Sequence, residues 1–91
     1  MRDIVQYFLD NYKYWIFIKK EAFTYNGLEE IKSITYQKNN LSITFMSLDL
    51  TRLGLEIRDI EKDIGEQVNA PNRDIHTLKE FINDSEIFKD S

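Results

Sequence analysis

Six apolar residues between positions 50 and 68 recur at steps of three and four, and this spacing constrains the fold more than any other feature of the sequence. They are Leu50, Leu53, Ile57, Ile60, Ile64 and Val68. Steps of three and four are the period of one apolar stripe along an α-helix. The spacing therefore predicts a long amphipathic helix over residues 50–68.

A second row on this predicted helix is acidic. Its members are Glu56, Asp59, Asp63 and Glu66. Helical geometry turns this row roughly 130° away from the apolar stripe, so one face is buried and the other is charged. The rival interpretation is a strand across Leu53, Leu55 and Ile57. It accounts for three residues where the helix accounts for six, so we expect the helix, although Leu55 falls on its outer side.

A β-hairpin is predicted over residues 33–46. Two alternating segments, 33–38 and 41–46, flank the pair Asn39-Asn40. Asparagine tolerates positive φ, so this pair suits a two-residue type I′ turn. The resulting register places four apolar side chains on one face, namely Ile34, Tyr36, Ile43 and Phe45. A two-stranded hairpin is marginal alone, so we expect helices to cover this face.

Helices are predicted at both ends of the chain. Residues 2–12 have the spacing of a helical core face, and we extend this helix to about Lys20, although a strand over residues 13–23 remains an alternative. Asn26-Gly27 marks a turn. A short helix is predicted over residues 73–83, after Pro71 ends the long one.

These elements predict an α+β domain: N-terminal helix, β-hairpin, long amphipathic helix and short C-terminal helix, with the helices packed on one face of the hairpin. The 91 residues suit a single domain over 1–91. Residues 84–91 are mostly polar, and we expect them to fray unless Ile87 and Phe88 dock.

The charge and composition exclude several classes of protein. The net charge of −4 comes from the second half, because residues 1–40 hold six Lys/Arg and five Asp/Glu, whereas residues 41–91 hold six and eleven. An acidic second half argues against binding nucleic acid, which requires a basic surface. We find neither a signal peptide nor an apolar run that could cross a membrane, so we expect a cytoplasmic protein.

The sequence offers no motif for catalysis, a cofactor or a metal. The absence of cysteine removes thiolate zinc sites and cysteine nucleophiles. Asp59, Glu61 and Asp63 partly resemble a calcium loop, but Ile64 and Ala70 stand where such a loop needs glycine and glutamate. His76 is the only histidine. We therefore expect no enzyme, no cofactor and no metal.

Our leading functional hypothesis is a small acidic intracellular protein that blocks or regulates another protein, as inhibitors, antitoxins and immunity proteins do. A phage or mobile-element origin suits such a chain. The acidic row Glu56, Asp59, Asp63 and Glu66 then meets a basic groove on the partner. Three aromatic residues of the first helix are further interface candidates, namely Tyr7, Tyr14 and Phe17.

Two alternatives remain open. The first is a self-associating structural or regulatory module, a homodimer formed through the helix stripe or the hairpin edge. The second is an enzyme with an unmarked carboxylate site, because sixteen acidic residues in a short chain guarantee some neighbours. The acidic row is also compatible with a merely solvated face.

Overall fold

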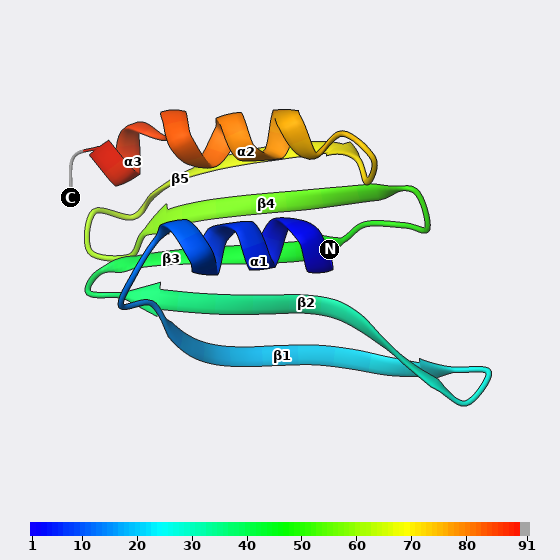
Figure 1. Cartoon of the computed structure of the whole chain (residues 1–91). Helices are drawn as coiled ribbons and strands as arrows, with labels where there is room; N and C mark the ends of the chain where they lie inside the picture. Colours follow the sequence, from blue (N-terminus) through cyan, green and yellow to red (C-terminus); the bar gives the residue numbers. More distant parts are fainter. Residues whose placement is uncertain (90–91) are drawn as a thin grey trace.

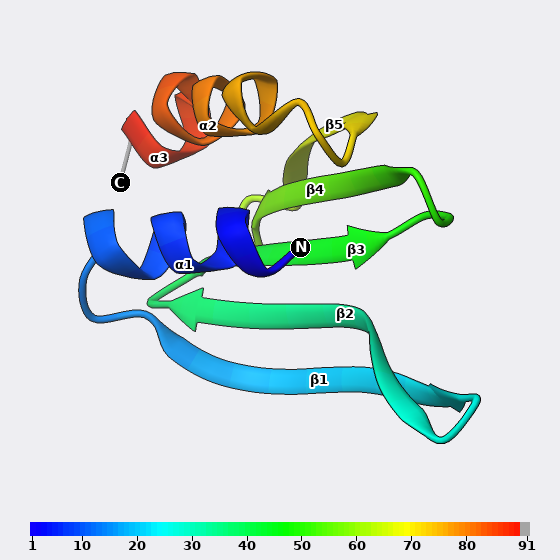
Figure 2. The ribbon, with the colours of Figure 1, turned by 45° about the vertical axis from the view of Figure 1, so that its right-hand side comes forward.

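The computed structural model describes residues 1–89 and shows a five-stranded antiparallel sheet with helices on one face (Figure 1). The strands lie side by side in chain order: β1 (Ile16–Tyr25), β2 (Leu28–Lys38), β3 (Leu41–Ser47), β4 (Arg52–Asp59) and β5 (Ile64–Pro71). Helix α1 (Arg2–Asn11) precedes the sheet, and α2 (Ile75–Asp84) and α3 (Glu86–Lys89) follow it. Figure 2 shows the helices together on one side.

The predicted long helix over residues 50–68 is wrong, and with it the predicted architecture. This segment forms β4 and β5, joined by a turn at residues 60–63. On β4 the side chains of Leu53, Leu55 and Ile57 alternate into the core, as the rival interpretation expected. Leu55, which did not fit the helix, is only 1% exposed, whereas Leu50 is 97% exposed. The apparent helical stripe combined two core residues of β4 and the partly buried Val68 of β5 with three exposed residues, namely Leu50, Ile60 and Ile64.

The N-terminal helix ends nine residues before the predicted limit of Lys20. Helix α1 covers Arg2–Asn11, and β1 begins at Ile16. Between them Tyr14 takes a positive φ of 68°, a left-handed conformation that cannot continue a helix. The strand alternative for this segment is therefore correct.

The hairpin over residues 33–46 is confirmed as β2 and β3, with the predicted register. Tyr36 lies opposite Ile43, and Ile34 lies opposite Phe45. In the turn, Asn39 takes a positive φ of 54° whereas Asn40 does not, so the turn departs from the expected type I′. The short helix expected over residues 73–83 is α2, which is capped by Asp74.

The core lies between the helices and the three central strands. Phe8 of α1 is fully buried, and its ring contacts the ring of Phe45 at a centroid distance of 5.6 Å. Leu78 and Ile82 of α2 are also fully buried. Ile87 of α3 is buried as well, so the docking that stood as the alternative to fraying is observed for this residue. Residues 90–91 of the tail predicted to fray lie outside the described part.

Candidate protein-binding surface

Strand β1 is an edge strand that the rest of the described chain leaves uncovered. It pairs with β2 along one side only, and all ten of its residues are exposed. Five of them are large and apolar, with between 48% and 66% of their surface accessible: Ile16, Phe17, Ile18, Phe23 and Tyr25. Globular proteins usually shorten, charge or cover such edges, because unpaired backbone groups beside apolar side chains attract other strands. This edge is therefore the leading candidate for a binding surface.

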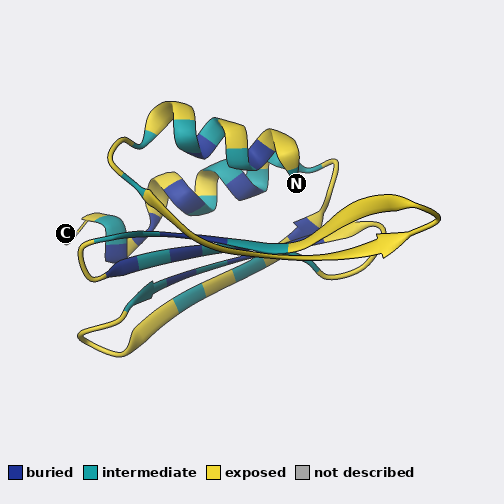
Figure 3. Ribbon diagram, turned by 90° about the horizontal axis from the view of Figure 1, so that it is seen from below, coloured by how far each residue is buried: buried dark blue, intermediate teal, exposed yellow. Residues whose placement is uncertain are grey.

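The far half of the β1–β2 hairpin projects beyond the helices and gives the molecule its length. We call residues 20–32 the arm. Figure 3 shows it as an exposed ribbon extending from the helix-covered part of the sheet. The molecule measures 43 Å along its longest axis and about 25 Å across the other two. No residue of the arm is buried, so the arm adds little to the core.

Local sequence explains why the arm forms without a core. Asn26 and Gly27 take φ values of 52° and 77°, the two positive values that a type I′ hairpin turn requires. Glycine adopts this conformation without steric cost. Lys20 also binds Glu29 across the strands at 3.0 Å, although an ion pair this exposed contributes little to stability.

A shallow apolar hollow lies where the arm meets the β3–β4 loop. Its volume is about 380 Å³, and it is lined by Phe23, Tyr25, Glu30, Ile31, Ser47 and Leu50. Leu50 projects from the loop almost fully into solvent. A hollow with such walls suits one apolar side chain of a partner more than a polar metabolite.

Two bulges interrupt the edge. The register between β1 and β2 shifts at Ile18 on β1 and at Lys32 on β2. Bulges bend and twist a strand, and they limit how far a neighbouring strand can pair with it. The stretch of β1 between Lys19 and Tyr25 has no extra residue, so it is the part best suited to accept another strand.

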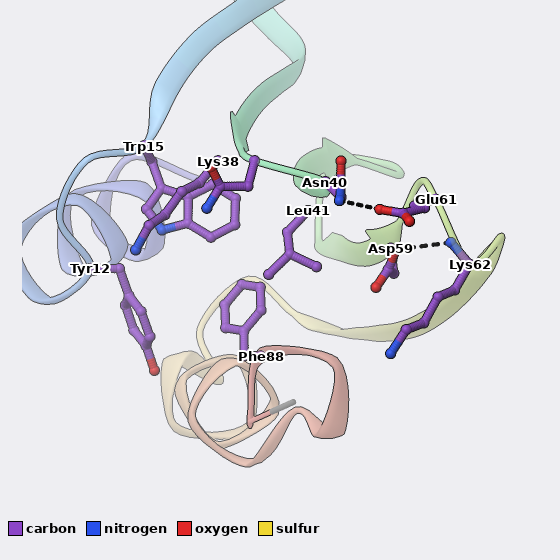
Figure 4. Close-up of a pocket in the computed structure, with 10 residues that line it drawn as sticks. Tyr12, Trp15, Lys38, Asn40, Leu41, Asp59, Glu61, Lys62 and Phe88 are labelled. Atoms are coloured by element: carbon purple, nitrogen blue, oxygen red, sulfur yellow. Dashed lines mark hydrogen bonds between the residues drawn. The ribbon is translucent and has the colours of Figure 1, made fainter. Parts of the chain in front are cut away.

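A second hollow lies at the other end of the sheet and is drawn in Figure 4. It has a volume of about 490 Å³, with Tyr12, Trp15, Leu41 and Phe88 among its lining residues. Its two carboxylates accept hydrogen bonds from the turns at this end of the sheet. Asp59 accepts a hydrogen bond from the Lys62 backbone N–H at 3.0 Å, and Glu61 accepts one from the Asn40 amide. Asp59 thus holds the β4–β5 turn, and Glu61 links that turn to the β2–β3 turn.

The shifted pKa values of three side chains each have a structural cause. Burial raises the pKa of the Tyr12 phenol, which donates a hydrogen bond to Asn83 at 2.6 Å. Hydrogen bonds from Thr77 lower the pKa of Asp74, the N-cap of α2. Hydrogen bonds from Thr51 lower the pKa of Asp49 in the β3–β4 loop. Asp74 and Asp49 thus stabilise a helix end and a turn, whereas the Tyr12 phenol links the end of α1 to α2.

Within the described residues, no group of three potential ligands is placed to hold a metal ion. The same residues contain no helix of the length and apolar character needed to cross a membrane.

The structure does not assemble the acidic row into one surface. Asp63 pairs with Arg58 at 2.8 Å beside the β4–β5 turn. Glu66 faces the helices, where it accepts hydrogen bonds from Ser85 and Ile87 of the α2–α3 segment. Glu56 lies on the opposite face of the sheet, beside Thr44, and Asp59 caps the turn. The premise of a shared helix face is wrong, and the role of these residues in binding stays a prediction.

The aromatic candidates divide between the core and the edge. Tyr7 is half-buried on α1, hydrogen-bonded to Asn83 and covered by the Lys79 ammonium. Tyr14 is 87% exposed in the connection before β1. Phe17 belongs to the exposed edge itself. Only Phe17 therefore lies in the surface that the structure favours.

Sequence reasoning missed most of this surface. Phe23, Tyr25 and Ile31 were not predicted to bind a partner, because Asn26-Gly27 was interpreted as a turn and not as the tip of a hairpin. The available signal was Asn26-Gly27 between two segments rich in aromatic and β-branched residues, which is a strong hairpin pattern.

No protein-family model matches this chain, and no solved structure matches it significantly.

Proposed function

We propose that this protein is a protein-binding module that engages its partner through the β1 edge and the arm. One observation carries the proposal, namely the ten consecutive exposed residues of an edge strand, five of them large and apolar. Burying such residues in a complex contributes about 1.5–3 kcal/mol for each side chain that becomes fully buried.

Strand addition is the binding mode that fits this surface. A partner segment in extended conformation would pair with the free backbone groups of β1, and its alternate side chains would contact Phe23 and Tyr25. The backbone pairing supplies affinity, and the hollow beside Leu50 supplies selectivity for one apolar side chain.

Occupying another protein in this way blocks or regulates it, which is how inhibitors, antitoxins and immunity proteins act. For a partner other than this chain, the net charge of −4 favours a basic surface, since long-range attraction speeds association. The charge of the chain as a whole supports this preference, without any single acidic residue being assigned to it.

A matched pair of variants tests the proposal. Phe23 and Ile60 are equally exposed, at 52% and 53%, but only Phe23 lies on the arm. Phe23→Glu removes an apolar anchor from the proposed surface, and Ile60→Glu makes the same charge change in the β4–β5 turn. We expect Phe23→Glu to weaken partner binding by about tenfold or more, the effect of losing an interface anchor, and Ile60→Glu to leave it unchanged.

The measurement has two steps. Proteins captured from the source organism by the wild type are compared with those captured by each variant, and a captured protein is then purified and titrated against the isotope-labelled wild type by NMR. Chemical-shift changes concentrated at residues 16–31 support the proposal. Full binding by Phe23→Glu, or shift changes confined to the β4–β5 turn, would contradict it.

A further inference from the structure

We infer that the occupant of the β1 edge is β1 of a second copy of this chain, paired antiparallel about a two-fold axis at Ala22. The inference rests on the proposed function, because it names a partner for the same surface. The two sheets would then continue across the axis as one.

The turn at Asn26-Gly27 determines which backbone groups of β1 are free. Tyr25 and Leu28 are partners that close a two-residue turn of type I′ geometry, and such a closing pair directs its backbone groups at one another, so we place those of Tyr25 on the side of β2. Hydrogen-bonded and non-bonded pairs alternate along an antiparallel ladder, so Phe23 also bonds to β2. Thr24 and Ala22 then direct their N–H and C=O groups outwards, at the open edge.

Two-fold symmetry limits the registers in which two such edges can pair. The same residue must lie on the axis in both copies, because outward-directed groups have to face one another. An axis at Lys20 or Glu21 places identical charges directly opposite, which is destabilising. An axis at Phe23 or Thr24 shortens the overlap to the last few residues of β1.

An axis at Ala22 keeps like charges from facing one another and retains a long overlap of the two strands. It pairs residues 19–25 of one copy with residues 25–19 of the other, and this stretch ends before the bulge at Ile18. Opposite positions are then Glu21 and Phe23, Lys20 and Thr24, and Lys19 and Tyr25, with no like charges opposite. The last pair brings an ammonium beside an aromatic ring, which is a favourable contact. Alanine at the axis lets the two backbones approach without crowding.

The same arrangement covers the apolar ends of the strand. Antiparallel pairing places Ile16–Ile18 of each copy near the hairpin tip of the other, where Leu28 is 66% exposed. Two apolar clusters that lie far apart in one molecule are therefore brought together in the pair. A second copy supplies this complementarity without any other partner.

The distribution of charge and the character of the other edge strand, β5, also favour pairing through β1. Figure 1 shows β1 at one edge of the sheet and β5 with α2, which belong to the acidic second half of the chain, at the other. Pairing through β1 keeps the two acidic halves apart. Strand β5 is the poorer candidate, because it ends at Pro71 and lies beside α2.

Single cysteines test both the pairing and its axis, because the chain contains none. Facing residues of a hydrogen-bonded pair have Cα atoms about 5.5 Å apart, within disulfide range. Ala22→Cys should therefore form a covalent dimer under mild oxidation. Thr24→Cys is the matched control. Position 24 lies two residues from the axis in each copy, so the two sulfurs are about 13 Å apart along the strands. We expect it to crosslink at least about tenfold more slowly, because that separation exceeds disulfide range.

Light scattering at several concentrations completes the test. Dimers that dissociate on dilution, together with rapid crosslinking of Ala22→Cys alone, support the inference. A monomer at every concentration overturns it, as does equal crosslinking of both variants. If the protein is a monomer and Phe23→Glu abolishes its binding to another protein, the second copy is not the occupant of the β1 edge. The proposed function is then still supported.

Discussion

Glu66 shows how one side chain connects the last strand to the last helix. A single oxygen of its carboxylate accepts from the Ser85 hydroxyl at 2.9 Å and from the Ile87 backbone N–H at 3.1 Å. Ser85 is 1% exposed, so its hydroxyl has little access to water. A buried donor without a partner is costly, and Glu66 removes that cost for two donors at the start of α3.

We therefore expect Glu66→Ala to lower the free energy of unfolding by about 1–3 kcal/mol, the cost of leaving buried donors unpaired. Glu66→Gln is the control, because its amide oxygen can still accept both hydrogen bonds, and it should retain most of the stability. Urea unfolding followed by circular dichroism measures both variants. Equal losses in the two variants would show that the charge of Glu66, rather than its accepting oxygen, stabilises this end of the chain.

At the scale of elements, β4 is defined by alternation that a helical wheel misses. Leu53, Leu55 and Ile57 are buried at every second position, whereas Ile60 is half exposed in the following turn. The strand and the helix make opposite predictions for Leu55 and Ile60. The strand places Leu55 in the core and Ile60 in solvent, whereas the helix places Ile60 in the core and Leu55 in solvent.

Leu55→Ala is expected to destabilise the protein by about 2–5 kcal/mol, since it leaves a cavity in the core. Ile60→Ala should change the free energy of unfolding by no more than about 0.5 kcal/mol, as for most exposed positions. Thermal or urea unfolding of the two variants provides the comparison. A larger loss for Ile60→Ala than for Leu55→Ala would contradict the strand assignment and restore the helix.

Elements with local signals could be predicted from the sequence, and those that depend on distant contacts could not. The β2–β3 hairpin follows from Asn39-Asn40 and two alternating segments, and α1 and α2 follow from their apolar periodicity. The turn between β4 and β5 carries no glycine, proline or asparagine, and Asp63 takes the positive φ instead. Without a visible turn, two short strands merged into one apparent helix.

The candidate surface was predicted only in part, for a related reason. Phe17 was identified as an interface residue, but on a helix rather than an edge strand. The exposure of Phe23 and Tyr25 depends on the arm extending past the helices, and nothing in the local sequence states which strand lies at the edge of a sheet. Strand order is set by tertiary packing, which one sequence does not reveal.

At the scale of the whole molecule, protection from hydrogen exchange reports whether the edge is covered. By the alternation of an antiparallel ladder, the amides of Ala22 and Thr24 are directed away from β2, so we expect them to be open to water in a single copy. In a pair of copies, the amides of Ala22 and Thr24 would donate the central hydrogen bonds between the two β1 strands, and these bonds would protect them from exchange.

We therefore expect exchange at Ala22 and Thr24 to slow as protein concentration rises, because the paired fraction increases by mass action. Ile43, in the centre of the sheet, should exchange slowly at every concentration and serves as the internal control. Hydrogen exchange followed by NMR measures all three amides. Rates at Ala22 and Thr24 that do not depend on concentration would exclude pairing through β1.

The unequal edges of the sheet also determine where association stops. Of the two edge strands in the described residues, β1 is the better suited to accept a strand, since β5 ends in proline and has α2 alongside it. When two copies pair through β1, neither copy has this edge left to accept a third. Growth into fibrils needs two such edges on every unit, so association through β1 alone ends with the pair.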